Sequence, residues 1–184
     1  FGSSFRPVVC SPRVPTTIVS PLLSYQPNTM PTVEERLAEL GLTLPPAVAP
    51  VASYVPYTRA GNTVFMSGQI PKLPSGEFML GKLGADCTVE QGQEAAKVCA
   101  LNMISQMKEA CGGDLEKVKQ VLKVEGFVNS TQEFTDHPKV INGFSDTIGQ
   151  VFGDKGKHAR FALGVSSLPL GVPVEVGAVF EIEG

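Results

Sequence analysis

The chain of 184 residues lacks several features that define common protein classes. It has no tryptophan and only two histidines, His137 and His158, which argues against a histidine-rich metal site. Every long apolar run is interrupted, so no segment reaches the roughly 20 residues of a membrane-spanning helix. Lysine and arginine total 15 against 18 acidic residues and form no basic cluster. This balance argues against a dedicated nucleic-acid surface, which needs several clustered cations.

The cysteines indicate free thiols rather than a disulfide framework. Cys10, Cys87, Cys99 and Cys111 show neither a CxxC motif nor paired spacing. We expect Cys99 and Cys111 to pack between helices, and Cys87, at a loop–helix junction, to be the most reactive thiol unless it is structural. A reducing compartment follows, and we expect the cytoplasm.

Residues 1–30 differ in composition from the remainder. They contain Arg6 and Arg13, no acidic residue, many serines and threonines, and five prolines. Such a composition is typical of an organellar transit peptide, which would place the protein in a mitochondrion or another organelle. The prolines disfavour the amphipathic helix of a mitochondrial signal, and an upstream extension before Met30 is the alternative. In either case we expect one folded domain over residues 31–184.

Two capping boxes and two stop signals predict the helices of this domain. Thr32–Glu35 opens a short helix, and Thr88–Gln91 opens the longest one, which ends at Gly112–Gly113. A third helix has Pro138 in its first turn and ends at Gly153. Strand patterns cover 51–58, 63–70, 118–130, 159–166 and 174–182, with a hairpin turn at 59–62.

This order, β-β-α-β-α-β-β behind a small helix, predicts an α+β fold. We expect a two-layer sandwich, with both long helices on one face of a single sheet. The other face would expose Tyr54, Phe65 and apolar residues of the last strands. Because large exposed apolar patches mark association, we expect a homo-oligomer whose sheets pack together.

The last two predicted strands carry one charge each among small residues. Side chains alternate along a strand, so Arg160 shares its face with Ala162 and Gly164, and Glu175 shares its face with Gly177. Small neighbours leave room beside a guanidinium and a carboxylate. The pattern therefore predicts a site for a small anionic ligand.

Four blocks of this chain, in order, resemble the signature of the RidA/YjgF family. They are Phe65-Met-Ser-Gly-Gln-Ile-Pro71 with Gly76-Glu77, Val140-Ile-Asn-Gly143 containing Asn142, Arg160 followed by Leu168-Pro169, and Val174-Glu-Val176. The resemblance covers about residues 49–183. It implies a chorismate-mutase-like fold and a homotrimer with a barrel-like centre and ligand clefts between subunits.

The resemblance also implies an activity: hydrolysis of reactive 2-imino acids to 2-oxo acids and ammonia, without a metal or an organic cofactor. By this likeness Arg160 binds the substrate carboxylate and Glu175 holds or activates water. Tyr54 and Ser67 line the same cleft, and Asn142 is a further candidate contact. The expected partners are a small carboxylate-bearing metabolite and other copies of the chain, with no membrane or nucleic acid.

Several positions depart from the family pattern. Ala162 replaces a common cysteine, Gly177 replaces a second acid, and Ala52-Ser53 replaces Gly-Pro before Tyr54. The leading helix and the long loop 72–86 are features of a longer subgroup. These changes leave two other functions open: binding of a 2-oxo acid or related metabolite without turnover, and an endoribonuclease or translation-inhibitor activity.

The candidate site residues also have structural interpretations. Arg160 and Glu175 are alternatively strand charges, although a symmetric hairpin would place Arg160 opposite Val179 rather than Glu175. Tyr54 alone would be a core or interface aromatic, and Ser67 a hydroxyl that satisfies backbone. For Asn142 a helix–strand hydrogen bond competes with ligand contact, and His158 is expected at the surface.

Overall fold

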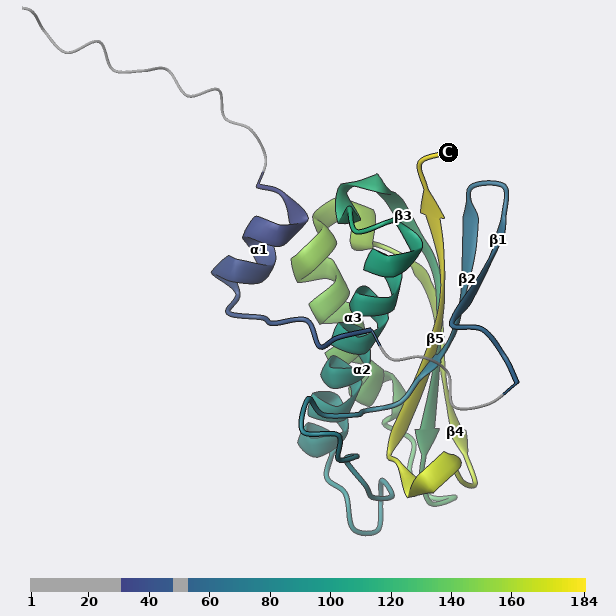
Figure 1. Ribbon diagram of the computed structural model, residues 1–184. Coiled ribbons are helices and arrows are strands. Elements are labelled where there is room, and N and C mark those ends of the chain that lie inside the picture. Colours follow the sequence, from purple (N-terminus) through teal and green to yellow (C-terminus); the bar gives the residue numbers. More distant parts are fainter. Residues whose placement is uncertain (1–30, 48–52) are drawn as a thin grey trace, which may run out of the picture. The chain divides into compact units, whose positions relative to one another are not determined.

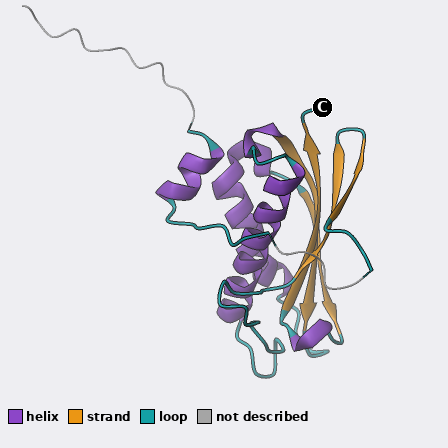
Figure 2. Ribbon diagram, viewed as in Figure 1, coloured by secondary structure: helices purple, strands orange, loops and turns teal. Residues whose placement is uncertain are grey.

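A computed structural model describes residues 31–47 and 53–184 of the chain. Its element order agrees with the predicted α+β arrangement, with a small helix first (Figures 1 and 2). The segment 1–30, to which we assigned a leader, lies outside the described residues. The helices and strands are α1 (Val33–Glu39), β1 (Tyr57–Ala60), β2 (Thr63–Gln69), α2 (Val89–Ala110), β3 (Val118–Asn129), α3 (His137–Phe152), β4 (Ala159–Val165) and β5 (Val174–Ile182), with short 3-10 turns η1 (Leu115–Lys117), η2 (Gly153–Gly156) and η3 (Pro169–Gly171).

The five strands form one sheet in the order β1-β2-β5-β3-β4. All neighbouring strands are antiparallel except β3 and β4, which run parallel. The symmetric hairpin that we considered for the last two strands does not form, because β3 lies between β4 and β5. The physical reason is the connection through α3: a helix crossover returns the chain parallel to the strand that it left. This places β4 at the edge of the sheet.

The two long helices cover one face of this sheet (Figure 1). Both predicted boundary signals of α2 are present: the Thr88 capping box opens it, and Cys111 caps its end before Gly112. In α3, Pro138 lies in the first turn and Gly153 follows the last residue with a φ of 59°. The two helices approach closely, because a Cβ at Gly143 would collide with the Gln93 carbonyl.

Alternation along the strands decides which side chains face the helices. In β5 every second residue from Val174 to Ile182 is buried against them. In β3 a register shift between Val121 and Lys123 interrupts the alternation. Val121 is therefore buried and Leu122 is 38% exposed, although strict alternation with the buried Val118 and Val124 would have buried Leu122. The extra residue of a bulge cannot be placed from a period-two pattern.

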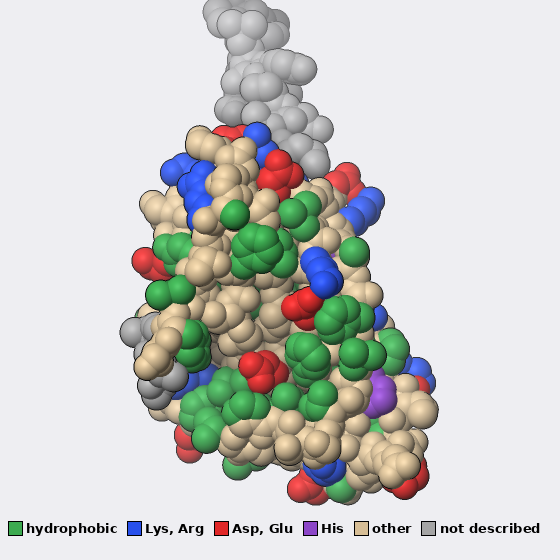
Figure 3. Space-filling model, turned by 90° about the vertical axis from the view of Figure 1, so that its right-hand side faces the viewer, with side chains coloured by type: hydrophobic (Ala, Val, Ile, Leu, Met, Phe, Trp, Pro, Cys, Tyr) green, Lys and Arg blue, Asp and Glu red, His purple; other side chains and the backbone are tan. Residues whose placement is uncertain are grey.

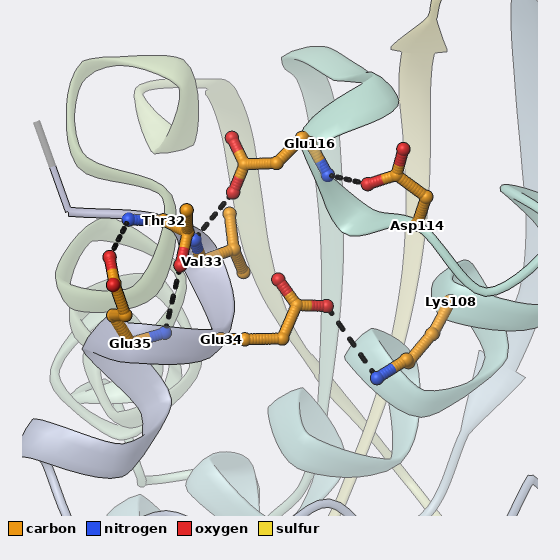
Figure 4. Close-up of polar contacts among 7 residues, drawn as sticks. All are labelled: Thr32, Val33, Glu34, Glu35, Lys108, Asp114 and Glu116. Carbon is orange, nitrogen blue, oxygen red and sulfur yellow. Dashed lines mark hydrogen bonds and ion pairs between the residues drawn. The ribbon is translucent and has the colours of Figure 1, made fainter. Parts of the chain in front are cut away.

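The short helix α1 attaches to the turn between α2 and β3 through polar contacts (Figure 4). Its predicted capping box is present, with the Thr32 side chain accepting from the Glu35 amide. The Glu116 carboxylate accepts from the Val33 amide at 2.5 Å, and Glu34 lies 3.5 Å from the Lys108 ammonium. Val33 is buried beneath these contacts. The helix is thus joined to the domain at its first turn.

The first strand is shorter than predicted and begins later. β1 covers Tyr57–Ala60, whereas the pattern predicted 51–58, of which residues 51 and 52 lie outside the described residues. Pro56, just before the strand, has no amide hydrogen to donate to a ladder. Tyr54 consequently lies in a bend ahead of the strand. In the described part of the chain, no helix is long and apolar enough to cross a membrane.

Candidate functional site

Arg160 lies on the helix-covered face of β4 and reaches α3. Its register partner is Val124, which is buried beneath the helices. One guanidinium nitrogen, Nη1, donates to Asn142 Oδ1 at 2.9 Å and to Ser145 Oγ at 3.0 Å. The other, Nη2, donates to the Pro138 carbonyl at 3.4 Å. The structure thus joins Arg160 and Asn142, and the predicted helix–strand hydrogen bond of Asn142 is confirmed.

The guanidinium has no carboxylate partner among residues 31–47 and 53–184. Its three acceptors are an amide, a hydroxyl and a backbone carbonyl, all of which are neutral. Neutral acceptors orient the planar group without cancelling its charge. A guanidinium carries five N–H donors, and the three hydrogen bonds use both donors of Nη1 and one of Nη2. The Nε donor and the second Nη2 donor remain, and such a pair can bind an anion in a bidentate manner.

A serine and a histidine that the sequence analysis did not select extend this group. Ser145 Oγ lies 2.9 Å from His158 Nε2, and His158 Nδ1 lies 2.6 Å from the Gly156 carbonyl. His158 is half-buried, contrary to the expected surface position. Burial lowers its pKa below 6.5, and the neighbouring Arg160 charge lowers it further, against a raising effect of the Gly156 hydrogen bond. The available sequence signal was the three-residue spacing of Asn142 and Ser145, which places both on one side of a helix.

Gly164, which we predicted to leave room for a ligand beside Arg160, makes room for two other side chains instead. A Cβ at Gly164 would collide with His137 Nε2 and approach Ser130 Oγ to 2.8 Å. Gly164 therefore makes room for the Ser130–His137 hydrogen bond of 3.0 Å, rather than for a ligand. A cleft of about 500 Å³ opens at this end of β4; its lining includes Lys82, Ser130 and His137, but not Arg160.

Glu175 lies on the opposite face of the sheet from Arg160. Its register partner Phe127 points away from the helices, as does Phe161, whose ring meets Phe127 edge-on at 5.9 Å. The Glu175 carboxylate is half-buried and has no hydrogen bond or ion pair within the described chain. Burial raises its pKa above 4.5. An unpaired carboxylate with a raised pKa is suited to accept a proton from water.

Ser67 and Gly68 of β2 lie close to this carboxylate. A Cβ at Gly68 would collide with Glu175 Oε1, so the glycine gives the carboxylate its place. Ser67 Oγ donates to the Val55 carbonyl at 2.7 Å, which confirms the backbone-satisfying interpretation of its hydroxyl. Tyr54 precedes Val55 and is 53% exposed. The structure therefore brings the β2 residues Ser67 and Gly68 to Glu175, with Tyr54 one residue before the Val55 that Ser67 contacts, whereas Arg160 and Asn142 lie on the other face of the sheet.

Gly177, which stands where the family pattern has a second acid, lies beside the carboxylate of Glu125. Glu125 is the register partner of Gly177, and its Oε2 lies 3.7 Å from the place of a Cβ at that position. Glu125 is paired with Lys123 at 2.6 Å, and the Lys123 ammonium lies 5.1 Å from the centre of the Phe161 ring. A carboxylate thus remains on this part of the sheet face, on β3 instead of β5.

The face that carries Glu175 is rich in uncovered hydrophobic side chains (Figure 3). Phe65 of β2 is 47% exposed and Leu163 of β4 is 52% exposed. Phe127 of β3 lies between them in the order of strands, and Phe161 lies with Leu163 on β4, edge-on to Phe127. The predicted apolar face is therefore present. Side chains of this size at such exposure are typical of an association surface.

The described thiols do not form a reactive or metal-binding centre. Cys87, Cys99 and Cys111 are buried, and burial raises the pKa of each, most strongly for Cys99. For Cys87 the Asp86 charge raises the pKa further, so its thiol is protonated at neutral pH. Cys10 lies outside the described residues. The described ranges hold no group of three or more His, Cys, Asp or Glu residues placed to bind a metal.

Comparison with known proteins agrees with the motifs. Residues 34–180 match the family described as "YjgF/chorismate_mutase-like, putative endoribonuclease". The chain is 49% identical over 151 residues to Protein TCP17 of Trypanosoma cruzi, covering 82% of this chain and 94% of the relative. It is 27% identical over 143 residues to a 2-iminobutanoate/2-iminopropanoate deaminase of Dermatophagoides farinae, covering 77% and 95%.

A solved structure also matches the fold. The protein Atu1372 of Agrobacterium tumefaciens, of unknown function, superposes with a TM-score of 0.76 at 45% identity, over 83% of this chain and 94% of that one. The helix-covered five-stranded sheet is thus the chorismate-mutase-like fold that the motifs implied. On the family match, the motifs and this fold, the chain belongs to the RidA/YjgF family.

Proposed function

We propose that this protein hydrolyses reactive 2-imino acids to 2-oxo acids and ammonia, in clefts between the subunits of a homotrimer. The observation that carries the proposal is the Arg160 guanidinium, which is held by three neutral acceptors and lacks a carboxylate partner in the described chain. A deaminase name on a relative at 27% identity supports the same reaction.

The substrate carboxylate binds Arg160 in this proposal. The fork of a guanidinium matches the two oxygens of a carboxylate, which the single ammonium of lysine cannot do. Asn142, Ser145 and the Pro138 carbonyl fix the plane of the fork before the ligand arrives. Preorganisation of this kind lowers the entropy cost of binding.

Glu175 activates the water. The reaction is R–C(=NH₂⁺)–COO⁻ + H₂O → R–CO–COO⁻ + NH₄⁺. The protonated imine carbon is already electrophilic, so a placed water and one carboxylate suffice. Glu175 takes one proton as the water oxygen bonds to carbon and returns it to the nitrogen, which becomes an ammonium leaving group. As the carbon–nitrogen bond breaks, the hydroxyl proton passes through Glu175 to the departing ammonia, which leaves the ketone and NH₄⁺. The raised pKa of Glu175, and the lack of a hydrogen-bond or ion-pair partner for it among the described residues, support this role.

Arg160 and Glu175 can meet only across a subunit boundary. Their side chains leave one sheet on opposite faces. The sheet and the buried core of one chain therefore separate its Arg160 from its Glu175. A second subunit that packs its sheet face beside the edge strand β4 of the first would bring its Glu175, Tyr54 and Ser67 toward Arg160. The apolar face of Figure 3 supplies a surface for such packing.

Release of ammonia and 2-oxo acid from imines tests the proposal. An amino-acid oxidase generates the imines in situ, and wild type is compared with Arg160→Ala and Arg160→Lys. We expect acceleration by wild type, none by Arg160→Ala, and a weak response from Arg160→Lys, which keeps the charge but loses the fork. Wild-type protein that is folded and trimeric but does not accelerate release would refute the reaction.

Binding of a 2-oxo acid without turnover is the second candidate. The Arg160 group alone suffices for it, and the glycine at 177 favours it, because the acid of the family pattern is missing there. In this case Arg160→Ala abolishes 2-oxo acid binding by a protein that accelerates no release. An endoribonuclease function instead requires RNA binding that weakens steeply with salt, as phosphate contacts do.

A further inference from the structure

The Arg160 guanidinium is the first member of a chain of hydrogen bonds that ends on the backbone of η2. The chain runs from Arg160 Nη1 to Ser145 Oγ at 3.0 Å, from there to His158 Nε2 at 2.9 Å, and from His158 Nδ1 to the Gly156 carbonyl at 2.6 Å. Three separate elements, β4, α3 and η2, contribute to it.

The chemistry of the two ends fixes the direction of every bond. A carbonyl oxygen can only accept, so His158 Nδ1 carries a proton and donates to Gly156. In a neutral imidazole Nε2 is then an acceptor, and the Ser145 hydroxyl donates to it. The guanidinium can only donate, so Ser145 Oγ accepts from Arg160. Each group therefore has one role as long as His158 is neutral.

We infer that Ser145 and His158 are positioning residues for the ligand anchor Arg160, and that protonation of His158 releases this hold. The inference rests on the proposed function, since it assigns Arg160 to the substrate carboxylate. A protonated imidazole has no acceptor nitrogen, so the Ser145 hydroxyl loses its acceptor. Two cations would then donate to the same hydroxyl oxygen. Affinity for a carboxylate would therefore decrease as the pH is lowered, even though Arg160 keeps its charge.

The other described charged groups around His158 either pair with other residues or face away from it. On η2, Asp154 pairs with Lys157 at 2.7 Å, and Lys155 donates to the Glu116 carbonyl. On α3, Asp146 lines the groove toward α2. On β3, Lys123 pairs with Glu125 on the other face of the sheet. Among the described residues, Arg160 is thus the charge that acts on His158, and it disfavours the imidazolium.

A second serine–histidine pair in the same molecule supplies the control. Ser130 Oγ lies 3.0 Å from His137 Nε2 but has no contact with Arg160. Ser145→Ala and Ser130→Ala therefore each remove a hydroxyl that is hydrogen-bonded to a histidine. Only Ser145 belongs to the hydrogen-bond chain of Arg160. His158→Gln keeps an acceptor for Ser145 but cannot titrate.

The experiment combines nitrogen-15 NMR of the imidazoles with kinetics of imine hydrolysis and 2-oxobutanoate titration, on the full chain. The chain has two histidines, so only two sets of imidazole signals have to be assigned. We expect the Nδ1–H tautomer for His158, a titration midpoint below 6.5, and a higher midpoint in Arg160→Ala. We expect Ser145→Ala to raise KM about three- to ten-fold with kcat within about two-fold, the loss of one hydrogen bond, and Ser130→Ala to leave both unchanged.

The pH profile is the decisive readout. We expect KM of the wild type to rise as the pH falls through the His158 titration, and KM of His158→Gln to stay level there. An Nε2–H tautomer, equal KM for Ser145→Ala and Ser130→Ala, or an unchanged pH profile in His158→Gln would overturn the inference. A wild type that neither hydrolyses imines nor binds 2-oxobutanoate would refute the proposed function and, with it, the anchor role. An active wild type together with an unchanged KM for Ser145→Ala would refute only the positioning role of Ser145 and His158.

Discussion

Arg160 and Glu175 leave the same sheet on opposite faces. Arg160 shares the helix-covered side with its register partner Val124, and Glu175 shares the open side with Phe127. The guanidinium is held by α3, and the carboxylate is placed by the absence of a side chain at Gly68. One chain therefore positions both charged groups but keeps them apart, on opposite faces of its sheet.

Gly68→Ala is expected to displace Glu175, with Gly177→Ala as the matched control. A methyl group at position 68 would collide with Glu175 Oε1, whereas one at 177 would meet Glu125 Oε2 at an ordinary 3.7 Å. We expect Gly68→Ala to lower kcat about ten-fold or more, the scale of a misplaced proton acceptor, and Gly177→Ala to change it less than about two-fold. Equal kcat values for the two variants would show that the position of Glu175 does not matter.

Glu175→Gln is expected to stabilise the fold at neutral pH. Burial raises the pKa of Glu175 in the folded chain above its ordinary 4.5, so the folded state binds the proton more tightly than the unfolded state. Stability from this group is present below 4.5 and is lost as the pH rises through the folded pKa. The urea midpoint of Glu175→Gln should exceed that of wild type at pH 7, and the difference should shrink toward pH 4. A variant less stable than wild type at pH 7 would contradict the burial cost.

Two glycines of α3 should respond to alanine in opposite ways. A Cβ at Gly143 would collide with the Gln93 carbonyl of α2, and one at Gly149 would meet nothing within 4 Å. We expect Gly143→Ala to lower the free energy of unfolding by about 1–3 kcal/mol, the usual cost of overpacking. Gly149→Ala should raise it by up to about 1 kcal/mol through helix propensity. Urea unfolding of both variants measures the pair, and a stable Gly143→Ala would show that the helices can separate freely.

Alkylation of the three described thiols should be slow in the native chain. Cys87, Cys99 and Cys111 are buried with raised pKa values, so few thiolates form at neutral pH. We expect Cys99 to react only on unfolding, since it is fully buried between α2 and the sheet. Mass mapping after iodoacetamide treatment at pH 7 follows each site. Rapid labelling of Cys99 would show that the core opens readily.

Local signals predicted most of the fold. Both capping boxes, Pro138 and Gly153 set helix ends that the structure confirms, because these residues act through their own backbone. The order of strands was less accessible. A hairpin after Val165 and a crossover through α3 have the same local pattern, and only the sheet shows that β3 lies between the last two strands.

For the site, the sequence pointed to the charges but not to their supports. Arg160 and Glu175 stood out against small neighbours, and Asn142 was part of a motif. Ser145 offered only its helical spacing from Asn142, and His158 offered no signal, because a serine inside a helix and a histidine before a strand are ordinary surface residues. Their roles depend on the contact between α3 and β4, which a local pattern does not contain.

Subunit mixing tests the central claim most directly, that one cleft takes Arg160 from one subunit and Glu175 from another. Arg160→Ala and Glu175→Gln, each inactive alone, are unfolded together in equal amounts and refolded. Random cyclic trimers should regain about a quarter of wild-type imine hydrolysis, since one cleft in four pairs the two intact residues. Wild type mixed equally with the double variant should also fall to about a quarter if the site spans subunits, and to about half if it does not. A mixture of the single variants that forms trimers and stays inactive would contradict the claim.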